Sequence, residues 1–197
     1  MEFLIFLAIL AALAFWVVAI YNKLVTLKNR YENAFAQIEV QLKRRYDLIP
    51  NLVETAKGYL EHERGTLEAV TNARNTAMAG LAAASKAPGS VDAMAELSKA
   101  EGALSGALGR LNIAVEAYPD LKASENMQQL SEELTSTENK VAFARQSYND
   151  QATAYNTYKQ SFPPVVFADM FGHTGDAGLL EFEDSAEIQA APSVSFS

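Results

Sequence analysis

The chain has 197 residues, a length that suits one domain with an anchor. Its formal net charge is −8. It contains no cysteine, which excludes disulfides, thiolate metal sites and cysteine nucleophiles. The acidic balance argues against nucleic acid as a partner, because such binding needs clustered Lys and Arg. Its two histidines, His62 and His173, are too far apart in sequence to indicate a His-rich metal centre.

The N-terminus carries an uncharged apolar run at residues 3–20. As a helix it would be about 27 Å long, close to the ~30 Å hydrocarbon core of a bilayer. A cleaved signal peptide and a buried helix of a soluble bundle are the alternatives. The first lacks its positively charged start, and a small bundle seldom needs the second. We expect an uncleaved transmembrane helix, with lipid contacts from Phe3, Leu4, Ile5, Phe6, Leu7, Leu10, Leu13, Phe15, Trp16, Val17, Val18 and Ile20.

Basic residues follow the apolar run directly, with Lys23, Lys28 and Arg30 nearest to it. Positive charge collects on the cytoplasmic side of a span, so we expect an outside N-terminus and a cytoplasmic soluble domain. We also expect these three residues to contact lipid headgroups.

Beyond residue 24 the apolar residues step by three or four, as in an amphipathic helix that continues the span. The expected inner positions are Leu24, Leu27, Tyr31, Phe35, Ile38 and Leu42. Pro50 removes a backbone donor and disfavours helix before it, so we expect a break or kink near residues 46–49. Asp47 is a possible cap for a new helix, with Pro50 in its first turn.

A polar cluster surrounds this expected kink. It comprises Lys43, Arg44, Arg45, Tyr46, Asp47 and Pro50. Binding of lipid headgroups is one interpretation, but in a straight helix Arg45 would lie about 37 Å from Ile20. We therefore favour an inter-helix ion pair or a capping role at the kink.

Three further helices are expected. The second covers about residues 48–84, with Ile49, Leu52, Ala56, Tyr59, Leu60, Leu67, Val70 and Ala77 inside. A loop at residues 86–90 precedes the third. Its stripe is Met94, Leu97, Glu101, Leu104, Leu108, Leu111, Val115 and Tyr118, on which Glu101 is a polar intrusion.

The fourth helix, about residues 123–160, has the most regular pattern, with steps alternating between three and four. Its inner positions are Met127, Leu130, Leu134, Thr137, Val141, Ala144, Tyr148, Gln151, Tyr155, Tyr158 and Phe162. The pattern predicts an all-α protein: a transmembrane helix followed by an antiparallel four-helix bundle.

The chain divides into four expected segments. Residues 1–21 form the anchor and residues 22–162 the bundle. Residues 163–184 form an apolar and acidic segment, and residues 185–197 a disordered tail.

Two long stretches resemble the LemA family of bacterial membrane proteins. They are residues 21–63, with the block RRYDLIPNLV, and residues 118–156, followed by an FP…FG…FE pattern. This resemblance implies a cytoplasmic-membrane protein with one span, an outside N-terminus and a cytoplasmic bundle, with no known activity or cofactor. His173 departs from the pattern, since an aromatic or apolar residue is expected there. Phe35 stands where tryptophan is common.

No motif indicates catalysis. His62 and Glu63 lack the second histidine of a zincin helix, and no nucleophile elbow or phosphate loop occurs. We expect no catalytic, metal or cofactor site. We expect a non-enzymatic scaffold that forms homo-oligomers at the inner face of the membrane. The alternative is an adaptor that binds a membrane partner, such as a protease, through the C-terminal segment.

Overall fold

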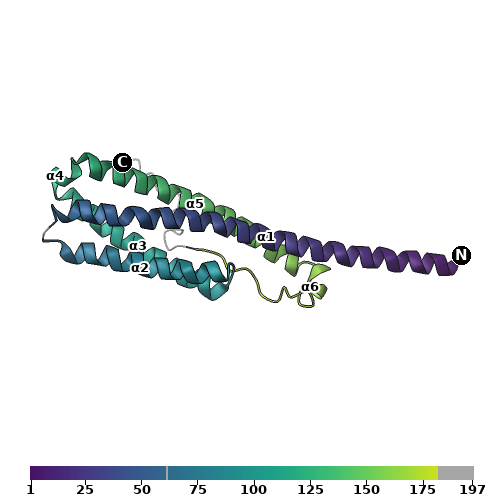
Figure 1. The fold of residues 1–197 in the computed structure, drawn as a ribbon. Helices are drawn as coiled ribbons and strands as arrows, with labels where there is room; N and C mark the ends of the chain where they lie inside the picture. The colour runs from purple at the N-terminus through teal and green to yellow at the C-terminus, as the bar shows by residue number, and fades with distance from the viewer. Residues whose placement is uncertain (61, 182–197) are drawn as a thin grey trace, which may run out of the picture.

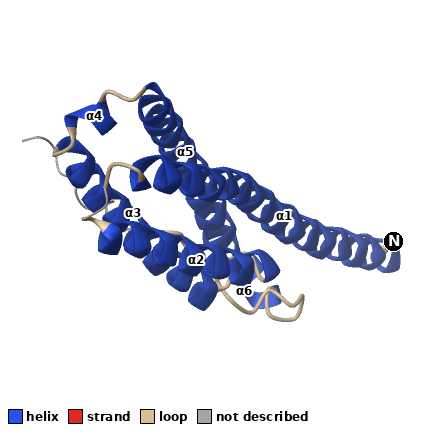
Figure 2. Cartoon of the chain, turned by 60° about the vertical axis from the view of Figure 1, so that its left-hand side comes forward, coloured by secondary structure: helices blue, strands red, loops and turns tan. Residues whose placement is uncertain are grey.

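The computed structural model describes residues 1–60 and 62–181, in which helices are joined by loops and no strand occurs (Figure 2). Its long helices are α1 (Glu2–Lys57), α2 (Arg64–Lys86), α3 (Val91–Glu116) and α5 (Glu125–Gln160). Two single-turn helices, α4 (Pro119–Lys122) and α6 (Pro164–Phe167), precede and follow α5. The predicted all-α class is therefore confirmed. The expected disordered tail, residues 185–197, lies outside the described residues.

The four long helices alternate in direction and form a bundle from which the N-terminal part of α1 projects alone (Figure 1). α1 packs along α5, α2 packs along α3, and α1 also contacts α2. At 56 residues, α1 is about 84 Å long and belongs to both the projecting part and the bundle.

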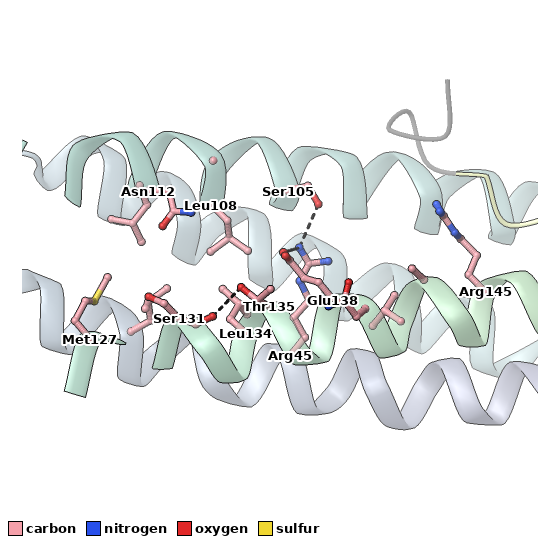
Figure 3. A pocket seen from close by; sticks show the side chains of 16 residues that line it. Arg45, Ser105, Leu108, Asn112, Met127, Ser131, Leu134, Thr135, Glu138 and Arg145 are labelled. Carbon is pink, nitrogen blue, oxygen red and sulfur yellow. Dashed lines mark hydrogen bonds and ion pairs between the residues drawn. The ribbon is translucent and has the colours of Figure 1, made fainter. Parts of the chain in front are cut away.

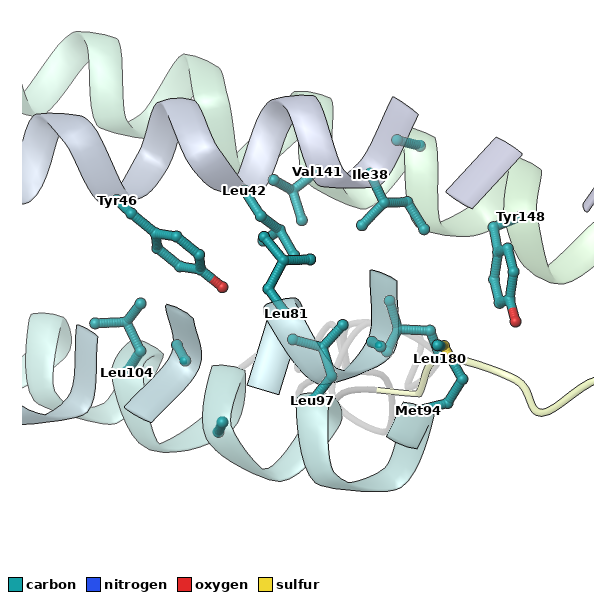
Figure 4. Packing of buried hydrophobic residues seen from close by; sticks show 14 of the residues in the cluster. Ile38, Leu42, Tyr46, Leu81, Met94, Leu97, Leu104, Val141, Tyr148 and Leu180 are labelled. Carbon is teal, nitrogen blue, oxygen red and sulfur yellow. The ribbon is translucent and has the colours of Figure 1, made fainter. Parts of the chain in front are cut away.

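The core follows the periodicity of the sequence (Figure 4). Every expected inner residue of the first helix is buried, from Leu24 to Leu42. On α3 the stripe from Met94 to Val115 is buried, Glu101 included. Two expected positions are wrong: Phe162 is 81 % exposed and Tyr59 is 46 % exposed.

The expected break near residues 46–49 is wrong, because α1 continues through Pro50 to Lys57. Proline has no N–H, so it leaves the carbonyl four residues earlier, that of Tyr46, without its helical donor. Arg74 of α2 supplies the replacement, as its Nε donates to the Tyr46 carbonyl oxygen over 2.6 Å. The first helix therefore ends at Lys57, the next begins at Arg64, and Asp47 lies inside α1 and caps no helix.

The chain after α6 runs back along the bundle. The amide of Gly178 donates to the carbonyl of Gly89 in the α2–α3 loop, over 2.8 Å. An added Cβ at Gly178 would lie 2.8 Å from the Val91 Cα, so only glycine permits this approach. Gly89 has φ +86° and faces the Tyr31 ring, which also requires glycine.

Candidate functional site

The projecting part of α1 is a candidate membrane span. Among the described residues, α1 is the one helix long and apolar enough to cross a bilayer. The expected lipid-contacting side chains are exposed with two exceptions: Val17 is half-buried, and Ile20 is buried in the protein core. An exposed apolar helix of this length suggests membrane anchoring, with its last turn partly covered by protein.

The three basic residues after the span are all exposed. Lys28 pairs with Glu32 one turn later at 3.9 Å, an exposed pair that contributes little to stability. Lys23 and Arg30 also lie on the surface of α1, available to headgroups if the span is inserted.

The polar cluster expected at a kink lies on the continuous helix α1. Its residues lie on two faces of that helix, one exposed and one buried. Lys43, Arg44, Asp47 and Pro50 are exposed, whereas Arg45 and Tyr46 are buried. Lys43 pairs with Glu39 along the surface of α1. The capping role is thus wrong, and the inter-helix ion pair involves Arg45.

Arg45 connects three helices (Figure 3). Its two terminal nitrogens lie 3.0 Å from a carboxylate oxygen of Glu101 on α3 and 3.0 Å from one of Glu138 on α5. One of them also donates to the Ser105 hydroxyl over 3.1 Å. The Tyr46 hydroxyl donates to the other oxygen of Glu101. A buried charge needs a paired charge and hydrogen bonds, and Glu101 receives both.

The protonation states of this network follow from burial. Burial raises the pKa of the Glu101 carboxyl, whereas the charge of Arg45 and the hydrogen bond from Tyr46 oppose that increase. Burial, and then the negative charge of Glu101, raises the pKa of Tyr46. The Tyr46 hydroxyl therefore stays protonated and remains a donor.

A cleft of about 440 Å³ lies beside the network, between α3 and α5 (Figure 3). Both polar and apolar side chains line the cleft, and its charged lining residues are Arg45, Glu138 and Arg145. The Glu101 side chain is fully buried and does not line this cleft. Among the described residues, no group of three or more His, Asp or Glu side chains could hold a metal ion. The ion pairs and hydrogen bonds of Arg45 join α1 to α3 and α5.

The C-terminal segment docks along α5 by a repeated arrangement. Asn156 exchanges two hydrogen bonds with the backbone of Ala177, of 2.9 and 2.8 Å. Asn149 does the same with Leu180, over 3.1 and 2.9 Å. The Tyr148 hydroxyl adds a bond to the Gly178 carbonyl over 2.6 Å. Each asparagine side chain thus satisfies an extended backbone that would otherwise lose its hydrogen bonds on burial.

His173 fills the position where an aromatic or apolar residue was expected. It is 6 % exposed, and its Nδ1 lies 2.9 Å from the Tyr155 hydroxyl. Burial, with the nearby charges of Lys28 and Lys159, lowers the pKa of His173. The ring therefore packs as a neutral aromatic group at neutral pH.

Sequence reasoning missed four of these contributors: Arg74, Glu138, Asn149 and Asn156. The asparagines did leave a signal, because a Tyr-Asn pair occurs at 148–149 and again seven residues later. Residues seven apart lie on one helix face, so the repeat marks a binding face on α5.

Comparison with known proteins connects this architecture to named relatives. The chain is 28 % identical to Protein LemA of Metamycoplasma hominis over 141 residues, covering 72 % of this chain and 60 % of that protein. It is 25 % identical to Magnetosome protein MamQ 2 of Paramagnetospirillum magneticum over 161 residues, covering 73 % and 58 %. For Magnetosome protein MamQ of Magnetospirillum gryphiswaldense the identity is 26 % over 158 residues, with the same two shares.

The chain thus spans about three fifths of the length of the curated relatives it matches. The family model for the LemA family matches residues 34–196, which include most of the bundle and the docked C-terminal segment. The chain belongs to the LemA family.

Proposed function

We propose that this protein is a non-enzymatic scaffold of the bacterial cytoplasmic membrane whose bundles associate with one another. Residues 3–20 anchor it, and α1 carries the bundle. Pro50 is the one helix breaker inside α1, and Arg74 compensates for it. Because α1 is continuous, it connects the span to the bundle without a flexible linker, so the bundle is held at a fixed position relative to the bilayer.

The proposed orientation has the N-terminus outside and the bundle in the cytoplasm. It is supported by the exposed Lys23, Lys28 and Arg30, which follow the span on the bundle side. Reporter fusions after Ser197 test it. A reporter that is active only outside the cytoplasm would reverse the orientation and leave the anchor intact.

The observation that carries self-association is an exposed aromatic side chain on the outer surface of the bundle. Phe143 of α5 is 76 % exposed and borders a cleft formed with Gln37 and Gln41 of α1. Val40, between those two glutamines in sequence, is also exposed. Isolated surface apolar residues are common, but an exposed phenylalanine beside a cleft can insert into the same cleft of a second copy.

The experiment compares Phe143→Ser with Ile113→Ser in the full-length protein in mild detergent. Both replace a side chain that is more than 70 % exposed, 76 % for Phe143 and 72 % for Ile113. The proposal expects the first to reduce the oligomer mass and the second to leave it unchanged. Equal masses for wild type and Phe143→Ser would refute the assigned surface.

The second candidate function is an adaptor that binds a membrane partner, such as a protease, through the C-terminal segment. The exposed side chains of Phe162, Val166 and Met170 favour it. Within the described part of this segment, Ala177 and Leu180 are buried against the bundle itself, whereas the three large apolar side chains around α6 are open to a partner. Serine substitutions at the three exposed positions would abolish co-purification of such a partner.

A further inference from the structure

The loop around α6 exposes large apolar side chains. Within residues 162–171, which we call the α6 loop, Phe162 is 81 % exposed, Val166 is 60 % exposed and Met170 is 79 % exposed. Val165 is also exposed, at 49 %. Four large apolar side chains within ten residues are thus open to solvent, where exposed apolar area is unfavourable.

The α6 loop lies beside the end of the candidate span (Figure 1). The Phe171 ring meets the Tyr21 ring edge to face, with centroids 5.2 Å apart. Phe167 stacks on Phe171 at 6.2 Å. Ile20 is buried in the same core cluster that Phe167 and Phe171 pack against. The loop is therefore level with the last turn of the apolar run.

The α1–α5 side of the bundle reaches closer to the span than the α2–α3 side. The α2–α3 loop meets α1 at Tyr31, beside Gly89, whereas the α6 loop meets α1 at Tyr21. Ten helical residues separate these levels, which is about 15 Å. The α6 loop is thus the part of the described bundle at the membrane end of α1.

The length of the span sets the level of the bilayer surface. Residues 3–20 give about 27 Å, just short of the ~30 Å hydrocarbon core, so the whole run is needed to cross it. Tyr21 then lies at the boundary between hydrocarbon and headgroups, where amphipathic aromatic side chains are enriched. Phe171, in contact with Tyr21, lies at that same boundary.

We propose that the α6 loop inserts into the interfacial layer of the bilayer that α1 crosses, as a second membrane contact of the same chain. The inference rests on the proposed anchoring by α1. Asp169 is exposed within the loop and sets its depth, since a carboxylate is tolerated among headgroups and costly in hydrocarbon. Two contacts fix the rotation of the bundle about the α1 axis, which a single helix leaves free.

The chain has no cysteine, so single-cysteine variants allow site-specific labelling without background. Val166→Cys and Met170→Cys report on the α6 loop, and Phe6→Cys reports on the span. Ile113→Cys is the control, at an exposed position on α3 that is far from the α6 loop in sequence. Each full-length variant is labelled with an environment-sensitive fluorophore and reconstituted into phosphatidylethanolamine and phosphatidylglycerol vesicles. Quenching by nitroxide-labelled lipid is compared with quenching by aqueous iodide.

The proposal expects lipid quenching and a blue-shifted emission at positions 6, 166 and 170, and iodide quenching at position 113. Lipid quenching at 6 with iodide quenching at 166 and 170 overturns the loop contact and leaves the anchor intact. Shielding of 166 and 170 from both quenchers also overturns it, because protein then covers the loop. Absence of lipid quenching at 6 refutes the anchoring itself.

Discussion

Removing the positive charge of the buried network, with Arg45→Met, is expected to destabilise the bundle strongly. The Glu101 carboxylate would remain fully buried, and among the described residues the Tyr46 hydroxyl would be its remaining hydrogen-bond partner. Breaking a buried ion pair from one side costs about 3–5 kcal/mol. For a chain of this size, that corresponds to a decrease in Tm of roughly 6–20 °C.

The triple variant Arg45→Met, Tyr46→Phe and Glu101→Leu is the matched control. It removes every buried polar partner together, and the Glu138 side chain, 46 % exposed, is left to water. Replacement of a whole buried network by apolar groups is often neutral. The triple variant should therefore be more stable than the single variant, although it carries more substitutions.

The stability cost of Arg45→Met should also depend on pH, and the direction of that dependence is a separate test. Arg45 lowers the pKa of Glu101 against the increase caused by burial, so its loss leaves that pKa higher still. The loss of unfolding free energy caused by Arg45→Met is therefore present at neutral pH, where Glu101 is charged. It decreases on acidification, because a protonated Glu101 no longer needs a positive partner. Thermal unfolding of the full chain in detergent micelles, followed by circular dichroism, measures both effects. Equal stability of wild type and Arg45→Met, or a cost that increases on acidification, would refute this reasoning.

Three further predictions concern α1 and the docked segment. Arg74→Ala leaves the Tyr46 carbonyl without its donor and should cost roughly 1.5–3 kcal/mol in chemical unfolding. Gly178→Ala places a Cβ 2.8 Å from the α3 backbone and should release the C-terminal segment to hydrogen exchange, whereas Gly175→Ala meets no atom within 4 Å and should not. Burial raises the pKa of Tyr31 from 10.0 to about 12, so its contribution to stability is present below pH 10 and lost as pH rises through that interval. Tyr31→Phe should reduce this alkaline loss, as measured by helix content.

Each of these predictions has a contrary result. An Arg74→Ala protein as stable as wild type would mean that α1 tolerates Pro50 without help from α2. Equal exchange rates for the two glycine variants would mean that the segment is not held against α3. An unchanged alkaline transition in Tyr31→Phe would place the cause in other groups.

Much of the fold follows from periodicity. Alternating steps of three and four residues predicted the inner faces of α1, α3 and α5. A helix that is buried on one face has apolar residues at those intervals, so the buried face can be identified from the sequence. Pro50 was misread because its effect depends on Arg74, which lies 24 residues later. Local rules for proline do not include a donor supplied by another helix.

The candidate site was predictable in part. The position of Glu101 on an apolar stripe and the cluster around Arg45 were both visible, but their pairing required the register between α1 and α3. The docking of the C-terminal segment was not anticipated, because asparagine is common on helix surfaces and carries no apolar signal. The Tyr-Asn repeat at 148 and 155 is what could have indicated it.

The central claim, a membrane-anchored bundle that self-associates, is tested most directly by the mass of the full-length protein in native lipid, together with single-particle imaging. The account predicts a homo-oligomer of defined symmetry whose mass decreases with Phe143→Ser. A monomer dispersed at random in the membrane would contradict it.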